Sequence, residues 1–174
     1  MTEGKKEFYR KVEEALRSKG YEYFDGDRDI PGKGRQHANK PDFIAIKGNK
    51  VYIGEIKSPA EGPRSSSWRQ RQNSYTEEFA AVREDAARRE KAGLLSPEIG
   101  GHEIIIRGQI ADYVRKIGIN FDLPTSVPRH MEIFMAYSFP EAEEGNVKKA
   151  LSNCSKKIHE KIDTGNGCVT YLFI

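Results

Sequence analysis

Two short apolar runs joined by a Gly-Asn pair dominate the hydrophobic pattern of the chain. Residues 43–47 read FIAIK, residues 50–56 read KVYIGEI, and Gly48-Asn49 lies between them. Glycine at the first central position suits a two-residue type II′ turn, so the pattern predicts a tight antiparallel hairpin. Because both runs are apolar on successive residues and do not alternate with polar ones, the hairpin is expected in the centre of a sheet covered on both faces.

The other apolar patterns predict helices on both sides of this hairpin and further strands after it. Apolar residues three and four positions apart predict helices over 3–19, from 74 to about 93, from Gly108 to about 116, and over 143–162. Short apolar runs predict strands over 21–24, 102–107, 131–137 and 168–174. This alternation favours one α/β domain over residues 1–174, a length too short for two comfortable domains.

Composition and charge narrow the classes of function. The 29 Lys and Arg residues against 26 Asp and Glu residues give a net charge of +3, so nucleic-acid binding must rest on local basic patches. The sequence holds no apolar stretch of membrane-spanning length, no signal-peptide pattern and no GxxxxGK[ST] segment. We therefore expect a cytoplasmic protein with no membrane association and no nucleotide cofactor.

Three charged residues lie at the open end of the predicted hairpin. The two-residue turn places Asp42 opposite Glu55, with Lys57 diagonally on the same face. Carboxylates roughly 5 Å apart repel by about 3 kcal/mol at an effective dielectric near 20, so positive charge is expected between them. Lys57 supplies part of it, and a Mg²⁺ ion on Asp42, Glu55 and the Ile56 carbonyl would supply the rest. The alternative is a surface hairpin with ordinary cross-strand ion pairs.

The pattern Pro41-Asp42, twelve residues, then Glu55-Ile56-Lys57 resembles the PD-(D/E)XK nuclease motif. The predicted helices before and after it are similar to those of the αβββαβ core of that superfamily, the restriction-endonuclease-like nucleases. The resemblance covers about residues 5–110, and residues from about 111 to 174 would form a C-terminal βαβ-type extension. It implies a mixed central sheet flanked by helices.

This resemblance also implies a Mg²⁺-dependent endonuclease that hydrolyses DNA phosphodiester bonds. Asp42, Glu55 and Lys57 would be the catalytic residues. Asp42 and Glu55, with the Ile56 carbonyl, would hold one or two Mg²⁺ ions, with Mn²⁺ as a substitute, and Lys57 would position or deprotonate the attacking water. A restriction-type enzyme working as a homodimer is the first expectation. A structure-selective repair or junction-resolving nuclease, and an inactive nucleic-acid-binding module, are the alternatives.

Two polar segments that enter and leave the hairpin carry the candidate DNA contacts. Basic side chains there would meet phosphates, and an exposed tryptophan among arginines would stack on a base. The alternatives are an ordinary solvated loop for the first segment and a tryptophan lid over the core for the second. The candidate residues are Lys33, Arg35 and Lys40 before the hairpin, and Arg64, Trp68, Arg69 and Arg71 after it.

Two helices offer further candidates. Members of the superfamily often carry an extra acid on the first helix, for which Glu7, Glu13 and Glu14 are available here, although each also suits a solvated helix surface. Gln109 and Tyr113 stand four residues apart and face the same side of a helix, which resembles the QxxxY feature of some nuclease subfamilies. For this pair, packing and capping roles are the favoured alternative.

Overall fold

The predicted hairpin forms, with the register that its turn implies. The computed structural model describes residues 1–33, 40–59, 76–163 and 165–174. Strands β2 (Phe43–Lys47) and β3 (Lys50–Ile56) are antiparallel, from the pair Phe43 and Gly54 to the pair Lys47 and Lys50. Gly48 has a φ of 62° whereas Asn49 does not have a positive φ, which is the signature of a type II′ turn.

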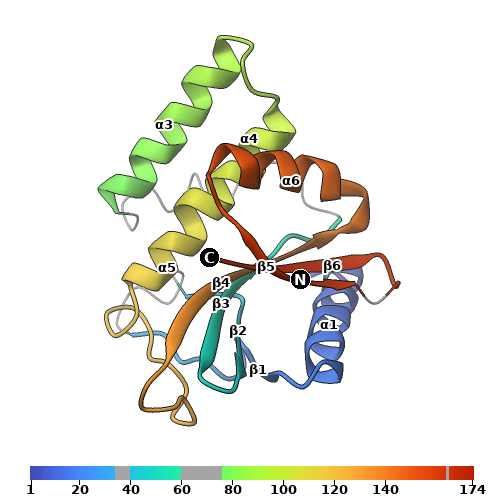
Figure 1. The fold of residues 1–174 in the computed structure, drawn as a ribbon, viewed down its shortest axis with the longest axis vertical. Coiled ribbons are helices and arrows are strands. Elements are labelled where there is room, and N and C mark those ends of the chain that lie inside the picture. The colour runs from blue at the N-terminus through green and yellow to red at the C-terminus, as the bar shows by residue number, and fades with distance from the viewer. Residues whose placement is uncertain (34–39, 60–75, 164) are drawn as a thin grey trace.

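The hairpin is interior in a mixed six-stranded sheet (Figure 1). The strand order is β1-β2-β3-β4-β6-β5, where β3 and β4 are parallel and all other neighbours are antiparallel. The remaining strands are β1 (Glu22–Asp25), β4 (Glu132–Pro140), β5 (Ile158–Asp163) and β6 (Cys168–Phe173). The prediction of a central hairpin in a single α/β domain is therefore confirmed.

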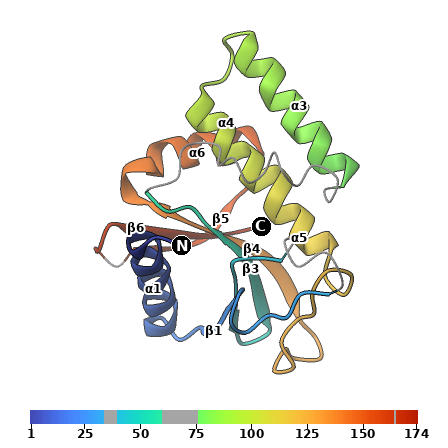
Figure 2. The same cartoon turned by 180° about the vertical axis from the view of Figure 1, so that it is seen from behind.

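Helices cover both faces of this sheet (Figures 1 and 2). Helix α1 (Glu3–Ser18) packs Phe8 and Val12 against Phe43 and Tyr52 on one face. A continuous helical segment and α6 cover the other face, and α3 lies on the outside of that segment. The segment consists of α4 (Pro97–Glu103), the π-helix η2 (Ile104–Ile110) and α5 (Ala111–Arg115). The other elements are α3 (Glu77–Lys91), the 3₁₀ turn η3 (Glu141–Glu143) and α6 (Glu144–Asn153).

The prediction of a strand over residues 102–107 is wrong, because these residues belong to α4 and the π-helix. The apolar run Ile104 to Ile106 is buried on all sides, since this helix is sandwiched between α3 and the sheet with α6. A continuous apolar run fits a buried strand and a buried helix equally well. The predicted αβββαβ order therefore takes β4 as its last strand, in place of residues 102–107. It ends at Pro140 and not near residue 110.

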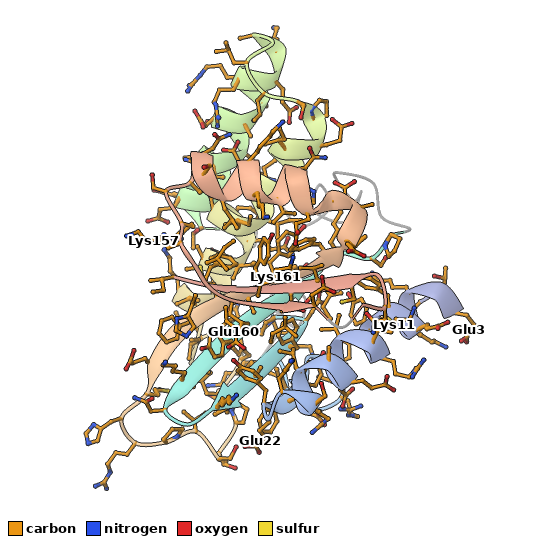
Figure 3. All side chains as sticks on the ribbon, turned by 45° about the vertical axis from the view of Figure 1, so that its right-hand side comes forward. Glu3, Lys11, Glu22, Lys157, Glu160 and Lys161 are labelled. Atoms are coloured by element: carbon orange, nitrogen blue, oxygen red, sulfur yellow. The ribbon has the colours of Figure 1, made fainter. Side chains whose placement is uncertain are left out.

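The predicted helix over 143–162 is also too long. Helix α6 ends at Asn153, and Ser155 turns the chain with a φ of 54° before β5 begins at Ile158. The expected βαβ-type extension does not form as such, because β5 and β6 are an antiparallel pair at the edge of the sheet. Edge strand β5 carries the charged side chains of Glu160 and Lys161 (Figure 3), which disfavour pairing with another chain.

Membrane insertion has no helical candidate in the described part of the chain. None of the helices there is both long enough and apolar enough to cross a bilayer.

Candidate functional site

The backbone positions of the predicted acids and the predicted lysine lie at the carboxyl end of β3. Asp42 immediately precedes β2, Glu55 is the penultimate residue of β3, and Lys57 follows β3. The Lys57 N–H continues the parallel ladder by donating to the Ser138 carbonyl oxygen at 2.8 Å. Because β3 and β4 are parallel, their carboxyl ends lie side by side. Open α/β sheets bind ligands at the carboxyl ends of their strands.

The Asp42 carboxylate is held by two donors from different elements. The Ile56 N–H donates to Oδ2 at 2.9 Å, and the Tyr9 hydroxyl of α1 donates to the same oxygen at 3.2 Å. The Asp42 backbone is fixed as well, since its N–H donates to the Gly54 carbonyl oxygen and its own carbonyl oxygen accepts from the Gly26 N–H. The side chain therefore bridges the hairpin and the first helix.

Gly26 permits the close approach that places Asp42. A Cβ atom at residue 26 would lie 2.1 Å from the Pro41 carbonyl oxygen and 2.8 Å from that of Asp42. We expect Gly26→Ala to lower the free energy of unfolding by roughly 1–3 kcal/mol, as overpacking does, and to displace Asp42. Urea denaturation measures the first effect. Gly4→Ala is the matched control, because nothing lies within 4 Å of its Cβ and alanine favours the helix. Equal stability of both variants would contradict this account.

The Glu55 carboxylate accepts hydrogen bonds from both residues of the QxxxY pair. Gln109 Nε2 donates to Oε1 at 2.8 Å, and the Tyr113 hydroxyl donates to Oε2 at 2.9 Å. Gln109 Nε2 also lies 2.7 Å from the Tyr113 hydroxyl oxygen, which closes the triangle. The sequence pattern thus identified the pair. The favoured packing role describes only part of what the pair does: Tyr113 is in the core, but both side chains also donate to Glu55.

Tyr113 remains a hydrogen-bond donor at all ordinary pH values. Burial raises the pKa of its hydroxyl well above the usual value, and the negative charges of Glu55 and Asp42 raise it further. The negative charges of both carboxylates therefore raise the pKa of the same buried hydroxyl, which agrees with the predicted proximity of Asp42 and Glu55. A permanent donor on Glu55 fixes the orientation of that carboxylate.

The π-helix brings Gln109 over Glu55. Gln109 lies within the π-helical turn and Tyr113 lies one turn later in α5. A Cβ atom at residue 108 would lie 2.1 Å from the Phe79 ring, so glycine there lets α3 pack directly on the π-helix. Single π-turns inside α-helices occur frequently at functional sites, and this one carries a side chain of the candidate site.

A hydrogen-bonded chain that the sequence does not indicate lies beside Lys57. His102 Nε2 is 2.9 Å from Glu143, and Nδ1 is 2.8 Å from the Tyr137 hydroxyl. Burial lowers the pKa of His102 below its usual value, against the opposing effect of the Glu143 hydrogen bond and charge, and this favours the neutral ring. Because a carboxylate only accepts, Nε2–H donates to Glu143 and the Tyr137 hydroxyl donates to Nδ1. The bond from His102 lowers the pKa of Glu143, to which the Lys57 charge contributes.

Two of the candidate DNA-contacting residues lie in the described part of the chain, and both make contacts within the protein. The Lys33 ammonium is 2.8 Å from Asp122, and the Lys40 ammonium donates to the Ile30 carbonyl oxygen at 2.9 Å. Five candidates fall outside the described residues, namely Arg35, Arg64, Trp68, Arg69 and Arg71.

The candidate acids of α1 pair with basic residues of the same helix and of the segment after β1. Glu7 pairs with Arg10 and Lys11, Glu14 with Arg10, and Glu13 with Arg17 and Arg28. These contacts are those of solvated helix charges, the alternative that the sequence left open. Tyr9 of α1 contacts Asp42 through its hydroxyl.

The ligands available to a metal ion at this edge are few. Among the described residues, no group of three or more His, Cys, Asp or Glu side chains is arranged to hold an ion. A cation here would rest on the two carboxylates and a backbone oxygen, and would keep water or phosphate at its other positions, as Mg²⁺ commonly does. The Ile56 backbone suits this role in position, because its N–H already contacts Asp42.

Comparisons with known proteins add no family assignment. No protein-family model, no curated protein and no solved structure matches this chain. The site geometry alone therefore carries the functional argument.

Proposed function

We propose that this chain is a Mg²⁺-dependent endonuclease of the PD-(D/E)XK type that hydrolyses DNA phosphodiester bonds. The observation that supports the proposal is that Asp42 and Glu55 lie at the carboxyl end of β3, within two residues of Lys57 or of its neighbours in the sheet, and that each carboxylate accepts from two donors. Ligand carboxylates of metal sites are held in this way by hydrogen bonds from neighbouring groups. Surface ion pairs on a hairpin would have no need of such supports.

Asp42, Glu55 and the Ile56 carbonyl would hold one or two Mg²⁺ ions, which Mn²⁺ could replace. The residues fit such an ion, because oxygen ligands in a small set suit a hard cation that retains water. Bound there, the metal would supply an activated water and stabilise negative charge on the phosphate.

The chain's own residues would orient the reacting groups. Gln109 and Tyr113 hold the Glu55 carboxylate, and Tyr9 with the Ile56 N–H holds that of Asp42. Lys57 is 7% exposed, so its charge is less screened by water than that of a surface lysine. We assign Lys57 the positioning or deprotonation of the attacking water, for which its three donors and its low exposure are suited.

A plasmid-cleavage assay tests the assignment. Supercoiled plasmid should be cut in Mg²⁺ and remain intact in EDTA, and Asp42→Asn and Lys57→Ala should each slow cleavage by about a hundredfold or more. Asp27→Asn and Lys50→Ala are the matched controls, because Asp27 is exposed and Lys50 lies at the far end of the same hairpin. Unchanged cutting by both site variants would remove these residues from the site. No cutting of any DNA form would favour the inactive binding module.

The cut ends distinguish the kinds of nuclease. We propose a restriction-type enzyme working as a homodimer, because two cuts in a duplex call for two symmetry-related sites. Sequencing of the ends should then give one defined sequence around the cut. Cuts located at mismatches, flaps or junctions, with no common sequence, would indicate a structure-selective repair or junction-resolving nuclease instead.

A further inference from the structure

A tyrosine of helix α1 contacts the candidate site. The Tyr9 hydroxyl donates to Asp42 Oδ2 at 3.2 Å, across 33 residues of sequence. The ring is partly buried against the core that α1 shares with the sheet, and the Lys5 ammonium lies 5.6 Å from its centroid. The ring is thus in contact with the core and with Lys5, and its hydroxyl reaches Asp42.

The two donors on Asp42 act together on its carboxylate plane. The terminal torsion of an aspartate is broad, so a single hydrogen bond lets the carboxylate pivot about the bonded oxygen. The Ile56 N–H belongs to the sheet and the Tyr9 hydroxyl belongs to helix α1, and both donate to Asp42 Oδ2. Two donors from different directions restrict that pivot, and thereby fix where the other oxygen, Oδ1, points.

The candidate acids of α1 and its tyrosine have different partners. Its acids Glu7, Glu13 and Glu14 are paired with basic residues, whereas Tyr9 reaches the site. A neutral hydroxyl adds no negative charge to the two carboxylates. Its hydrogen bond can act on a cation through the orientation of the Asp42 carboxylate.

We propose that Tyr9 is a positioning residue that orients Asp42 for the divalent cation. This inference rests on the proposed function, because it takes Asp42 as a metal ligand. A hydrogen bond that orients a ligand typically changes metal affinity by about 10- to 100-fold, so removal of the hydroxyl in Tyr9→Phe should weaken Mn²⁺ binding by about tenfold. At saturating Mn²⁺ or Mg²⁺ the cleavage rate should return to that of the wild type.

Tyr21→Phe is the matched control. It removes a tyrosine hydroxyl that also donates to a carboxylate, that of Glu160 at 2.6 Å, but on edge strand β5. Mn²⁺ affinity is measured by calorimetry and electron paramagnetic resonance on each full-length variant, alongside its melting temperature. In the metal-free protein, the Ile56 amide resonance should shift and its hydrogen exchange should accelerate in Tyr9→Phe and not in Tyr21→Phe, since that amide shares Oδ2 with Tyr9.

The outcomes separate this inference from the proposed function. Weaker Mn²⁺ binding in Tyr9→Phe alone, with a melting temperature like that of Tyr21→Phe, supports the positioning role. Wild-type Mn²⁺ affinity in Tyr9→Phe overturns it, while the assignment of Asp42 as a ligand stands. A wild-type protein that binds no Mn²⁺ and cuts no DNA overturns the proposed function, and this inference with it.

Discussion

Replacing Glu55 by glutamine is expected to lower both the Mn²⁺ affinity and the rate of DNA cleavage by about a hundredfold or more. Loss of an outer hydrogen bond to a metal ligand already costs about 10- to 100-fold, so loss of the charged ligand itself should cost at least the upper value. The amide also brings an NH₂ group against one of the two donors that hold residue 55, Gln109 or Tyr113. Orientation and charge are therefore lost together.

Glu160→Gln is the control for this substitution. Glu160 is also a strand glutamate that accepts from a tyrosine hydroxyl, but it lies on the edge strand β5. Calorimetric Mn²⁺ titration and plasmid cleavage should leave Glu160→Gln close to the wild type. If Glu55→Gln behaves in the same way as Glu160→Gln, then Glu55 is not a metal ligand, and the two donors above it have a structural role only.

The central hairpin was predictable because its determinants are local. Gly48-Asn49 selects the turn, the turn sets the register, and the register places Asp42 and Glu55 at the same end of the strands. The double-faced apolar pattern likewise indicated a covered sheet, which the structure confirms. Most other strands and α1 also lie close to their predicted bounds, since each is bounded by turn residues.

Except for Gln109 and Tyr113, the residues that support the site were not predictable, because they depend on contacts between distant elements. His102 meets Tyr137 and Glu143 across 35 and 41 residues, and the run around His102 was predicted as a strand. No spacing in the sequence relates these three residues. Tyr9 likewise had no sequence signal beyond its place on α1. The predicted contribution from that helix was one of its acids. Gln109 and Tyr113 were found because their four-residue spacing puts them on the same side of a helix and resembles the QxxxY feature of some nuclease subfamilies.

Glu103→Gln is expected to lower the free energy of unfolding by about 3 kcal/mol, the largest stability effect among these substitutions. Breaking a buried ion pair by removing one partner costs roughly 3–5 kcal/mol. The Glu103 side chain is fully buried and accepts from Arg89 at 2.8 Å and from Asn153 at 3.0 Å. The lower end of that range applies because the Arg89 side chain is 26% exposed and also pairs with Asp85.

Glu98→Gln on the same helix is the control, because Glu98 is exposed. Urea denaturation followed by circular dichroism should show a much lower midpoint for Glu103→Gln than for Glu98→Gln, whose loss is limited to the small effect of an acid in the first turn of a helix. Equal midpoints would mean that the buried pair contributes nothing. The effect should extend to the site. Glu103 joins α3 and α6 to the start of the π-helix that carries Gln109. A loosened π-helix would hold Glu55 less firmly, so Mn²⁺ affinity should fall in Glu103→Gln, whereas Glu98→Gln should retain it.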